Sequence, residues 1–174
     1  IEDYLATLGL VLKVYIDDLT QVTRISQMTQ KTNQFNLTTK RYAEREITAL
    51  IKEEGSTVIS INVQDKYGDN GLTGLAILDN TQSIIDTLLL SCRVLGRNIE
   101  YQFMDVVVDI AKRNKLDELS AAYIKTNKNH QVVDFYEKCG FVKLNESDGD
   151  SQYSLQVNSY NNQDIQYIGV KDGR

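Results

Sequence analysis

An apolar segment that runs straight into a basic, glycine-containing turn and then a helix constrains this chain most. The segment covers residues 83–92, Arg93, Gly96 and Arg97 follow it, and apolar spacing predicts a helix over residues 99–114. Free N–H groups and the positive end of a helix dipole favour an anion at such a junction. The sequence therefore predicts a phosphate-binding turn, although the arginines also fit the interpretation of solvated charges on an ordinary connection.

Hydrophobic periodicity along the rest of the chain predicts one mixed α/β domain. Helices are expected at residues 1–9, 19–31, 42–54, 99–114 and 132–140, and strands at 10–15, 57–63, 72–78, 83–92, 119–124, 141–144 and 153–157. A turn is expected at residues 67–71, so the three strands before the longest helix form a meander. No internal repeat interrupts this order.

Length and composition favour a single core. The chain has 174 residues, of which 41% are hydrophobic and 25% are charged. We expect one domain over residues 1–158, with residues 1–9 as a connector helix from an upstream domain and 159–174 as a polar tail. Because the chain opens with Ile1, we also expect it to be cut from a longer protein.

Net charge and cysteine content exclude several classes of partner and ligand. The net charge is -5 and the basic residues are scattered, which argues against nucleic acid, and no apolar run is long enough for a membrane span. Only Cys92 and Cys139 are present, without zinc-ligand spacing. These features predict a soluble, cytoplasmic domain without a metal.

Two motifs resemble GNAT acyltransferases. Residues 93–98, Arg-Val-Leu-Gly-Arg-Asn, are similar to the Arg/Gln-x-x-Gly-x-Gly/Ala loop, and residues 129–141 resemble an Asn at a helix start followed by Phe-Tyr-Glu-Lys-x-Gly-Phe. The resemblance implies the GNAT fold, an α/β fold with a central, mixed, mostly antiparallel sheet flanked by helices. It also implies an acyl donor carried on phosphopantetheine, either coenzyme A (CoA), as acyl-CoA, or an acyl carrier protein.

The same resemblance assigns site residues. It implies that the phosphate is held by Arg93, Gly96, Arg97 and Asn98, and that the pantetheine arm lies beside Leu90. Asn98 stands where the family has Gly or Ala, and its Cβ narrows the approach of a diphosphate to the backbone. This departure favours the single phosphate of a carrier-bound arm over coenzyme A.

The second motif supplies a residue that contacts the pantetheine arm and a residue that donates a proton. By the resemblance, Asn129 lies beside the pantetheine and the Tyr136 hydroxyl protonates the departing thiolate. Asn129 is also interpretable as a helix cap, and Tyr136 as a core aromatic residue. His130, the single histidine, is expected at the surface.

Three longer stretches resemble one group within that fold. Residues 24–42, 68–71 and 89–97 are similar to FkbH-like proteins. These proteins join a HAD-type phosphatase region to a C-terminal GNAT-like domain and make glyceryl-carrier protein, a precursor of methoxymalonyl-carrier protein in polyketide extender-unit biosynthesis. The resemblance implies an upstream HAD domain and an acyl carrier protein as partners; the chain itself contains no Asp-x-Asp-x-Thr/Val phosphatase motif.

Substrate-binding and covalent roles follow from position. The cluster Asn33, Gln34 and Asn36 lies between two predicted helices, where the GNAT resemblance implies an acceptor site, and it suits a hydroxylated acyl group or else caps a polar loop. Cys92 lies where the apolar strand meets the basic turn, which suits a transient acyl acceptor, although a small buried side chain is the competing interpretation. Asp65, Asp86 and Glu100 are further candidates for a general base.

Two functions are compatible with these residues. The first is acyl transfer to or from a phosphopantetheine thiol, with Tyr136 and Cys92 as the catalytic groups. The second is a non-catalytic module of the same fold that docks a carrier protein for the upstream domain. Asn98 and the lack of an assured base favour the second.

Overall fold

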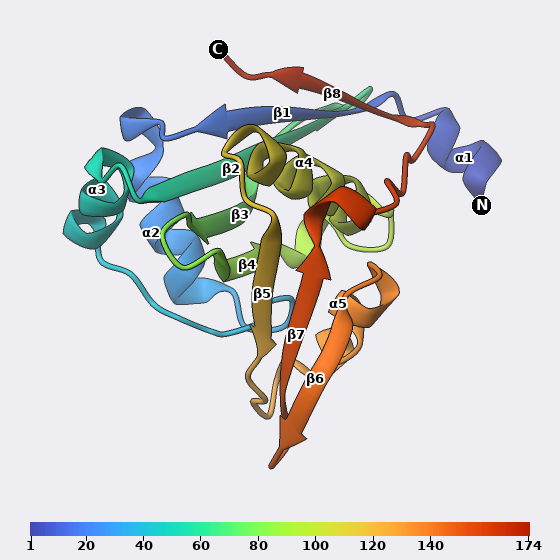
Figure 1. Ribbon diagram of the computed structural model, residues 1–174. Coiled ribbons are helices and arrows are strands. Elements are labelled where there is room, and N and C mark those ends of the chain that lie inside the picture. Colours follow the sequence, from blue (N-terminus) through green and yellow to red (C-terminus); the bar gives the residue numbers. More distant parts are fainter.

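The computed structural model describes residues 1–174 as a single eight-stranded sheet with helices on both faces (Figure 1). The helices are α1 (Glu2–Ala6), α2 (Val22–Lys31), α3 (Glu44–Lys52), α4 (Ile99–Arg113) and α5 (Phe135–Lys138). Short 3-10 turns include η2 (Cys92–Val94) and η3 (His130–Val132). All five predicted helical regions therefore contain a helix.

The sheet has the order β6-β7-β5-β4-β3-β2-β1-β8. Its strands are β1 (Leu10–Ile16), β2 (Ser56–Asp65), β3 (Gly68–Asp79), β4 (Ile84–Leu90), β5 (Glu118–Tyr123), β6 (Val142–Ser147), β7 (Asp150–Gln156) and β8 (Ile168–Asp172). The pairs β4–β5 and β1–β8 are parallel, and the other neighbours are antiparallel. The predicted mixed, mostly antiparallel sheet is confirmed.

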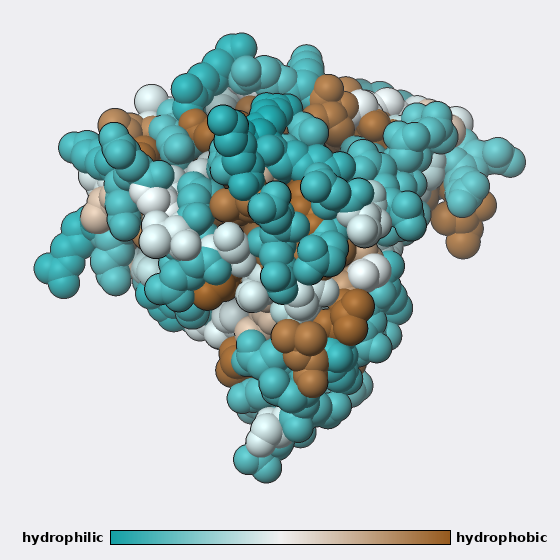
Figure 2. Space-filling model, viewed as in Figure 1, coloured by the Kyte–Doolittle hydropathy of each residue, from teal (hydrophilic) through white to brown (hydrophobic).

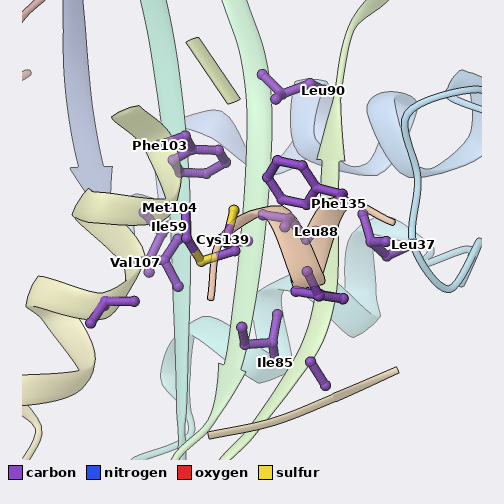
Figure 3. Close-up of a cluster of buried hydrophobic side chains, with 14 of the residues drawn as sticks. Leu37, Ile59, Ile85, Leu88, Leu90, Phe103, Met104, Val107, Phe135 and Cys139 are labelled. Atoms are coloured by element: carbon purple, nitrogen blue, oxygen red, sulfur yellow. The ribbon is translucent and has the colours of Figure 1, made fainter. Parts of the chain in front are cut away.

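Alternation along the strands divides the core between the two faces of the sheet. Ala76 and Leu78 of β3 belong to the larger cluster, which α4 and α5 cover. Leu75 and Ile77 of the same strand belong to the smaller cluster, which α2 and α3 cover. Figure 3 shows part of the larger cluster, where Phe135 of α5 points toward strand β4.

The hairpin between β2 and β3 is tighter than the sequence predicts. The turn was expected at residues 67–71, but β3 already begins at Gly68 and pairs with Asp65. The pairing is irregular near Asn62, and Gly71 has a φ of +72°, so the turn-forming residues are accommodated inside a bulged strand. These polar and glycine residues are tolerated in the strand because they lie at the exposed end of the hairpin.

The polar C-terminal segment is folded against the domain. The Tyr160 hydroxyl donates a 2.6 Å hydrogen bond to the buried carboxylate of Asp105 on α4, and the backbone N–H groups of Gln163 and Asp164 donate to the same carboxylate. Beyond this anchor, β8 pairs with β1 at the edge of the sheet. The predicted tail therefore ends in an additional strand.

The surface in Figure 2 is mainly hydrophilic, with separate hydrophobic groups. Val142 and Leu144 are exposed on the edge strand β6. None of the helices combines the length and the apolar character needed to cross a bilayer.

Candidate active site

The opening between β4 and β5 forms the centre of the site. These parallel strands pair at one position only, Ile84 with Ser120 near the start of β4, and then diverge. Beyond that point β4 continues to Leu90 and delivers the chain to η2 and the N-terminus of α4. The predicted apolar strand, basic turn and helix thus lie at the edge of a gap in the sheet.

The turn has the backbone shape that its glycine predicts. Gly96 has a φ of +84°, and a Cβ built there meets nothing within 4 Å, so the space beside it is open. Asn98 has a φ of +63°, a left-handed conformation that Asn tolerates better than most residues. Its side-chain amide donates a 2.6 Å hydrogen bond to the Tyr167 hydroxyl. The side chain of Asn98, which differs from the Gly or Ala of the motif, is therefore held in place by the C-terminal segment.

The two arginines of the turn differ in their contacts. Arg97 lies 3.1 Å from the Asp65 carboxylate, and its charge is partly neutralised there. The backbone N–H of Tyr67, together with Arg97, lowers the pKa of Asp65 below its usual value. Arg93 contacts only the Ser91 hydroxyl, at 3.3 Å, and is exposed. Of the two, Arg93 is the arginine available to a phosphate.

A cavity of about 200 Å³ lies between the start of α4 and the η3–α5 region; we refer to it as the α5 cavity. Its lining includes Gly96, Glu100, Asp134 and Lys138. Burial raises the pKa of Glu100, and its Oε2 atom is buried without a hydrogen-bond partner. With two carboxyl groups and one lysine, this cavity suits a ligand with little negative charge.

A larger cavity of about 560 Å³ lies between α2, the loop after it and the end of β4; we refer to it as the α2 cavity. It brings together four residues predicted from the sequence: Asn33, Gln34, Leu90 and Cys92. Cys92 is exposed, so the interpretation as a small buried side chain is wrong. Leu90 is itself buried, and the lining contains no carboxyl group.

Positive charge characterises the α2 cavity. Arg24, Lys31 and Lys128 line it, although the chain as a whole carries a net charge of -5. Arg24 and Lys31 come from α2 and Lys128 comes from the loop after β5, so no single motif contains all three. The cavity favours an anionic ligand and disfavours a polyamine.

The side chains of Asn36 and Asn129 point into the protein interior. The Asn36 side chain donates to the Thr32 carbonyl and accepts from the Thr39 N–H. The Asn129 amide donates to the carbonyls of Asn36 and Ile124, and its oxygen accepts from the Tyr123 hydroxyl and the Thr126 N–H. Neither side chain lines the α2 or α5 cavity, so a ligand role for either stays a prediction.

Tyr136 lies inside the larger core cluster. Its ring packs against Phe141 and Tyr153, with ring centroids 4.9 Å and 5.5 Å away. Burial raises the pKa of its phenol strongly. The core interpretation fits this position, and the role as an acid stays a prediction.

The remaining candidates line neither cavity. Asp86 is bound by Lys40 and by the Tyr42 hydroxyl, each at 2.5 Å, and so connects the loop before α3 to β4. Cys139 is buried, and His130 is exposed, as expected for the single histidine.

The sequence matches no protein-family model and no curated protein. Solved structures do resemble it. The ribosomal-protein-S18-alanine N-acetyltransferase of Escherichia coli has a TM-score of 0.64 at 10% identity, covering 87% of this chain and 97% of that one. A mutant form of the spermidine/spermine N-acetyltransferase SpeG of Vibrio cholerae has a TM-score of 0.62 at 14% identity, covering 86% and 95%.

A third similar structure contains a bound cofactor. YncA of Salmonella typhimurium, a putative acetyltransferase solved with its cofactor acetyl-CoA, has a TM-score of 0.59 at 13% identity, covering 88% of this chain and 98% of that one. The shared architecture establishes that this chain has the GNAT fold, as the motifs predicted.

Proposed function

We propose that this domain transfers an acyl group carried as a thioester on phosphopantetheine, and that the acyl group is glyceryl or a related hydroxyacyl group. The observation that carries the proposal is the α2 cavity, where the Cys92 thiol, the amides of Asn33 and Gln34 and three cations line one space. The amides suit hydroxyl groups of the acyl chain, and the cations suit its phosphate or an acidic carrier.

The path of the arm follows from the two cavities. The phosphate would lie near Arg93 and Gly96, and the arm would pass from the α5 cavity through the gap between β4 and β5. Because Glu100 and Asp134 line the α5 cavity, one phosphate is accommodated there better than the several phosphates of coenzyme A. This supports an acyl carrier protein as partner, and the FkbH-like resemblance adds an upstream HAD domain.

Covalent transfer would use Cys92. Its sulfur attacks the thioester carbonyl carbon, the new carbon–sulfur bond forms, and the bond from that carbon to the pantetheine sulfur breaks. The proton of the Cys92 thiol ends on the departing thiol, so the step is balanced. Tyr136 is the further candidate for protonating the departing thiolate, in which case its phenolate takes up the proton that Cys92 releases.

A docking module without chemistry is the second candidate function. Two observations favour it: no carboxyl group or histidine lines the α2 cavity to act as a base, and the chain's own residues 35–38 fill the gap between the strands. In this case the domain would present a carrier-bound acyl group to the upstream HAD domain.

Calorimetric titration with a carrier protein tests binding of the phosphopantetheine arm, which both candidate functions require. We expect the phosphopantetheine-bearing carrier to bind and the same carrier without its arm to bind at least tenfold more weakly. Equal affinity of the two forms would contradict the proposed arm-binding site.

A further inference from the structure

Residues 35–38, here called the plug segment, occupy the opening between β4 and β5. The carbonyl of Phe35 accepts a 3.0 Å hydrogen bond from the Leu90 N–H, and the Leu37 N–H donates to the Leu88 carbonyl at 3.2 Å. On the other side, the Ile124 N–H donates to the Leu37 carbonyl at 2.8 Å. The plug segment therefore acts as a short additional strand that joins β4 to the end of β5.

Phe35 separates the two cavities of the site. It lines both the α5 cavity and the α2 cavity, and it is only 6% exposed. Its ring meets Phe135 of α5 edge-on, with ring centroids 5.1 Å apart. In the loop of Figure 1 that runs from α2 to α3, the plug segment is the part that reaches across to β5.

We propose that the plug segment is a gate, with Phe35 as the residue that closes the passage between the α5 cavity and the α2 cavity. The inference rests on the proposed function, because an arm that runs from the α5 cavity beside Gly96 to Cys92 in the α2 cavity passes Phe35, which lines both cavities. In the closed state, the N–H of Leu90 and the carbonyl of Leu88 are already occupied.

Opening exchanges the bonds between the plug segment and β4 for bonds to the arm, and it also breaks the bonds from the Ile124 N–H to Leu37 and from the Asn129 amide to Asn36. A pantetheine arm carries two amides, which can pair with the Leu90 N–H and the Leu88 carbonyl as Phe35 and Leu37 leave them, so little net hydrogen-bond energy is lost on the β4 side. The plug lies in a stretch between α2 and α3 without helix or regular strand, and long connections of this kind are commonly functional. The bonds of Asp86 to Lys40 and Tyr42 hold the far end of this stretch on β4.

A reversible cross-link tests the gate. Asn36 and Leu89 form an isolated antiparallel bridge. The bonds on either side of it make this a non-hydrogen-bonded pair, with Cα atoms about 4.5 Å apart, within the range a disulfide spans. The variant is Asn36→Cys/Leu89→Cys in a Cys92→Ser background, and the probe is acetyl-phosphopantetheine. We expect oxidation to weaken its binding at least tenfold and reduction to restore it; equal binding by the two forms would overturn the gate.

Hydrogen exchange of the unaltered domain tests the gate without a ligand and without substitutions in the core. The amides of Leu37, Leu90 and Ile124 should exchange at least about 100-fold faster than amides at the centre of β2, because they open with the plug segment alone. Exchange at the rate of β2 would overturn the gate. Fast exchange combined with no binding of acetyl-phosphopantetheine to any form would leave the gate supported and contradict the proposed function instead.

Discussion

The side-chain amide of Asn129 donates a 3.0 Å hydrogen bond to the backbone carbonyl of Asn36, which lies 93 positions earlier in the chain. A second bond from the same amide, 2.9 Å long, reaches the carbonyl of Ile124. One fully buried side chain thus fixes the loop after α2 against the end of β5. The two walls of the site are held together at this point.

Replacing Asn129 with Ala should therefore destabilise the fold. One buried and one partly buried carbonyl group lose their donor, and each lost bond costs about 1–3 kcal/mol in the free energy of unfolding. Urea denaturation measures the loss. Asn127→Ala, at an exposed position of the same loop, is the matched control and should change stability by less than about 0.5 kcal/mol. Equal effects of the two substitutions would contradict the anchoring role.

The contacts of Asp86 make stability depend on acid pH. Burial alone would raise the pKa of Asp86, but hydrogen bonds from Lys40 and Tyr42 outweigh it and hold the pKa below its usual value. A carboxyl group whose folded pKa is lowered stabilises the fold above its unfolded pKa of about 3.9. That contribution is lost as the pH falls through the folded pKa.

Asp86→Asn should consequently lower the melting temperature at pH 7 and have a smaller effect near pH 3. Thermal unfolding followed by circular dichroism at both pH values measures the difference. Asp148→Asn, in the exposed turn between β6 and β7, serves as control and should show no comparable pH dependence. A pH-independent effect of Asp86→Asn would show that its ion pair and hydrogen bonds do not carry the stabilisation.

The cations of the α2 cavity should set affinity for an anionic ligand. Lys31→Gln and Lys128→Gln should each weaken binding of a glyceryl-loaded carrier about two- to fivefold, since exposed charges contribute up to about 1 kcal/mol each. Added salt should reduce the difference. The control is Lys112→Gln, an exposed lysine at the end of α4 and outside the cavity. If Lys112→Gln has the same effect, the charge of the cavity is not what the carrier recognises.

Tyr136→Phe separates chemistry from packing. This change keeps the ring that packs against Phe141 and Tyr153, so it should change the free energy of unfolding by less than about 1 kcal/mol. If the phenol protonates the departing thiolate, the rate of transfer should fall by about 100-fold or more while carrier affinity stays the same. Transfer at the unchanged rate would remove Tyr136 from the mechanism.

Most of the fold could be predicted from the sequence because its elements are amphipathic. The apolar alternation in β2 and the helical spacing in α4 identify each element and the residues that it contributes to the larger core cluster. Strand β8 carries no such signal, since Ile168 is its single buried residue and its pairing with β1 uses backbone groups. A strand held by backbone bonds at a sheet edge leaves little trace in side-chain pattern.

The site was predictable only in part, for a similar reason. Gly96 and Cys92 are marked by the strand, turn and helix around them, and both line a cavity. The position of Phe35 depends on backbone bonds to Leu90, which no local pattern reports. The clustering of Arg24 with Lys128 depends on how α2 and the loop after β5 are brought together, and this is known only once the sheet is assembled.

Intact-mass spectrometry of the domain after incubation with a glyceryl thioester of a carrier protein tests the central claim most directly. Covalent acyl transfer predicts a glyceryl adduct on the unaltered domain that is absent from Cys92→Ala, while Cys139→Ala, at the buried cysteine, keeps the adduct. An equal adduct on Cys92→Ala, or no adduct on the unaltered domain while the carrier remains bound, would contradict transfer through Cys92. The second of these results would be the one expected of a docking module.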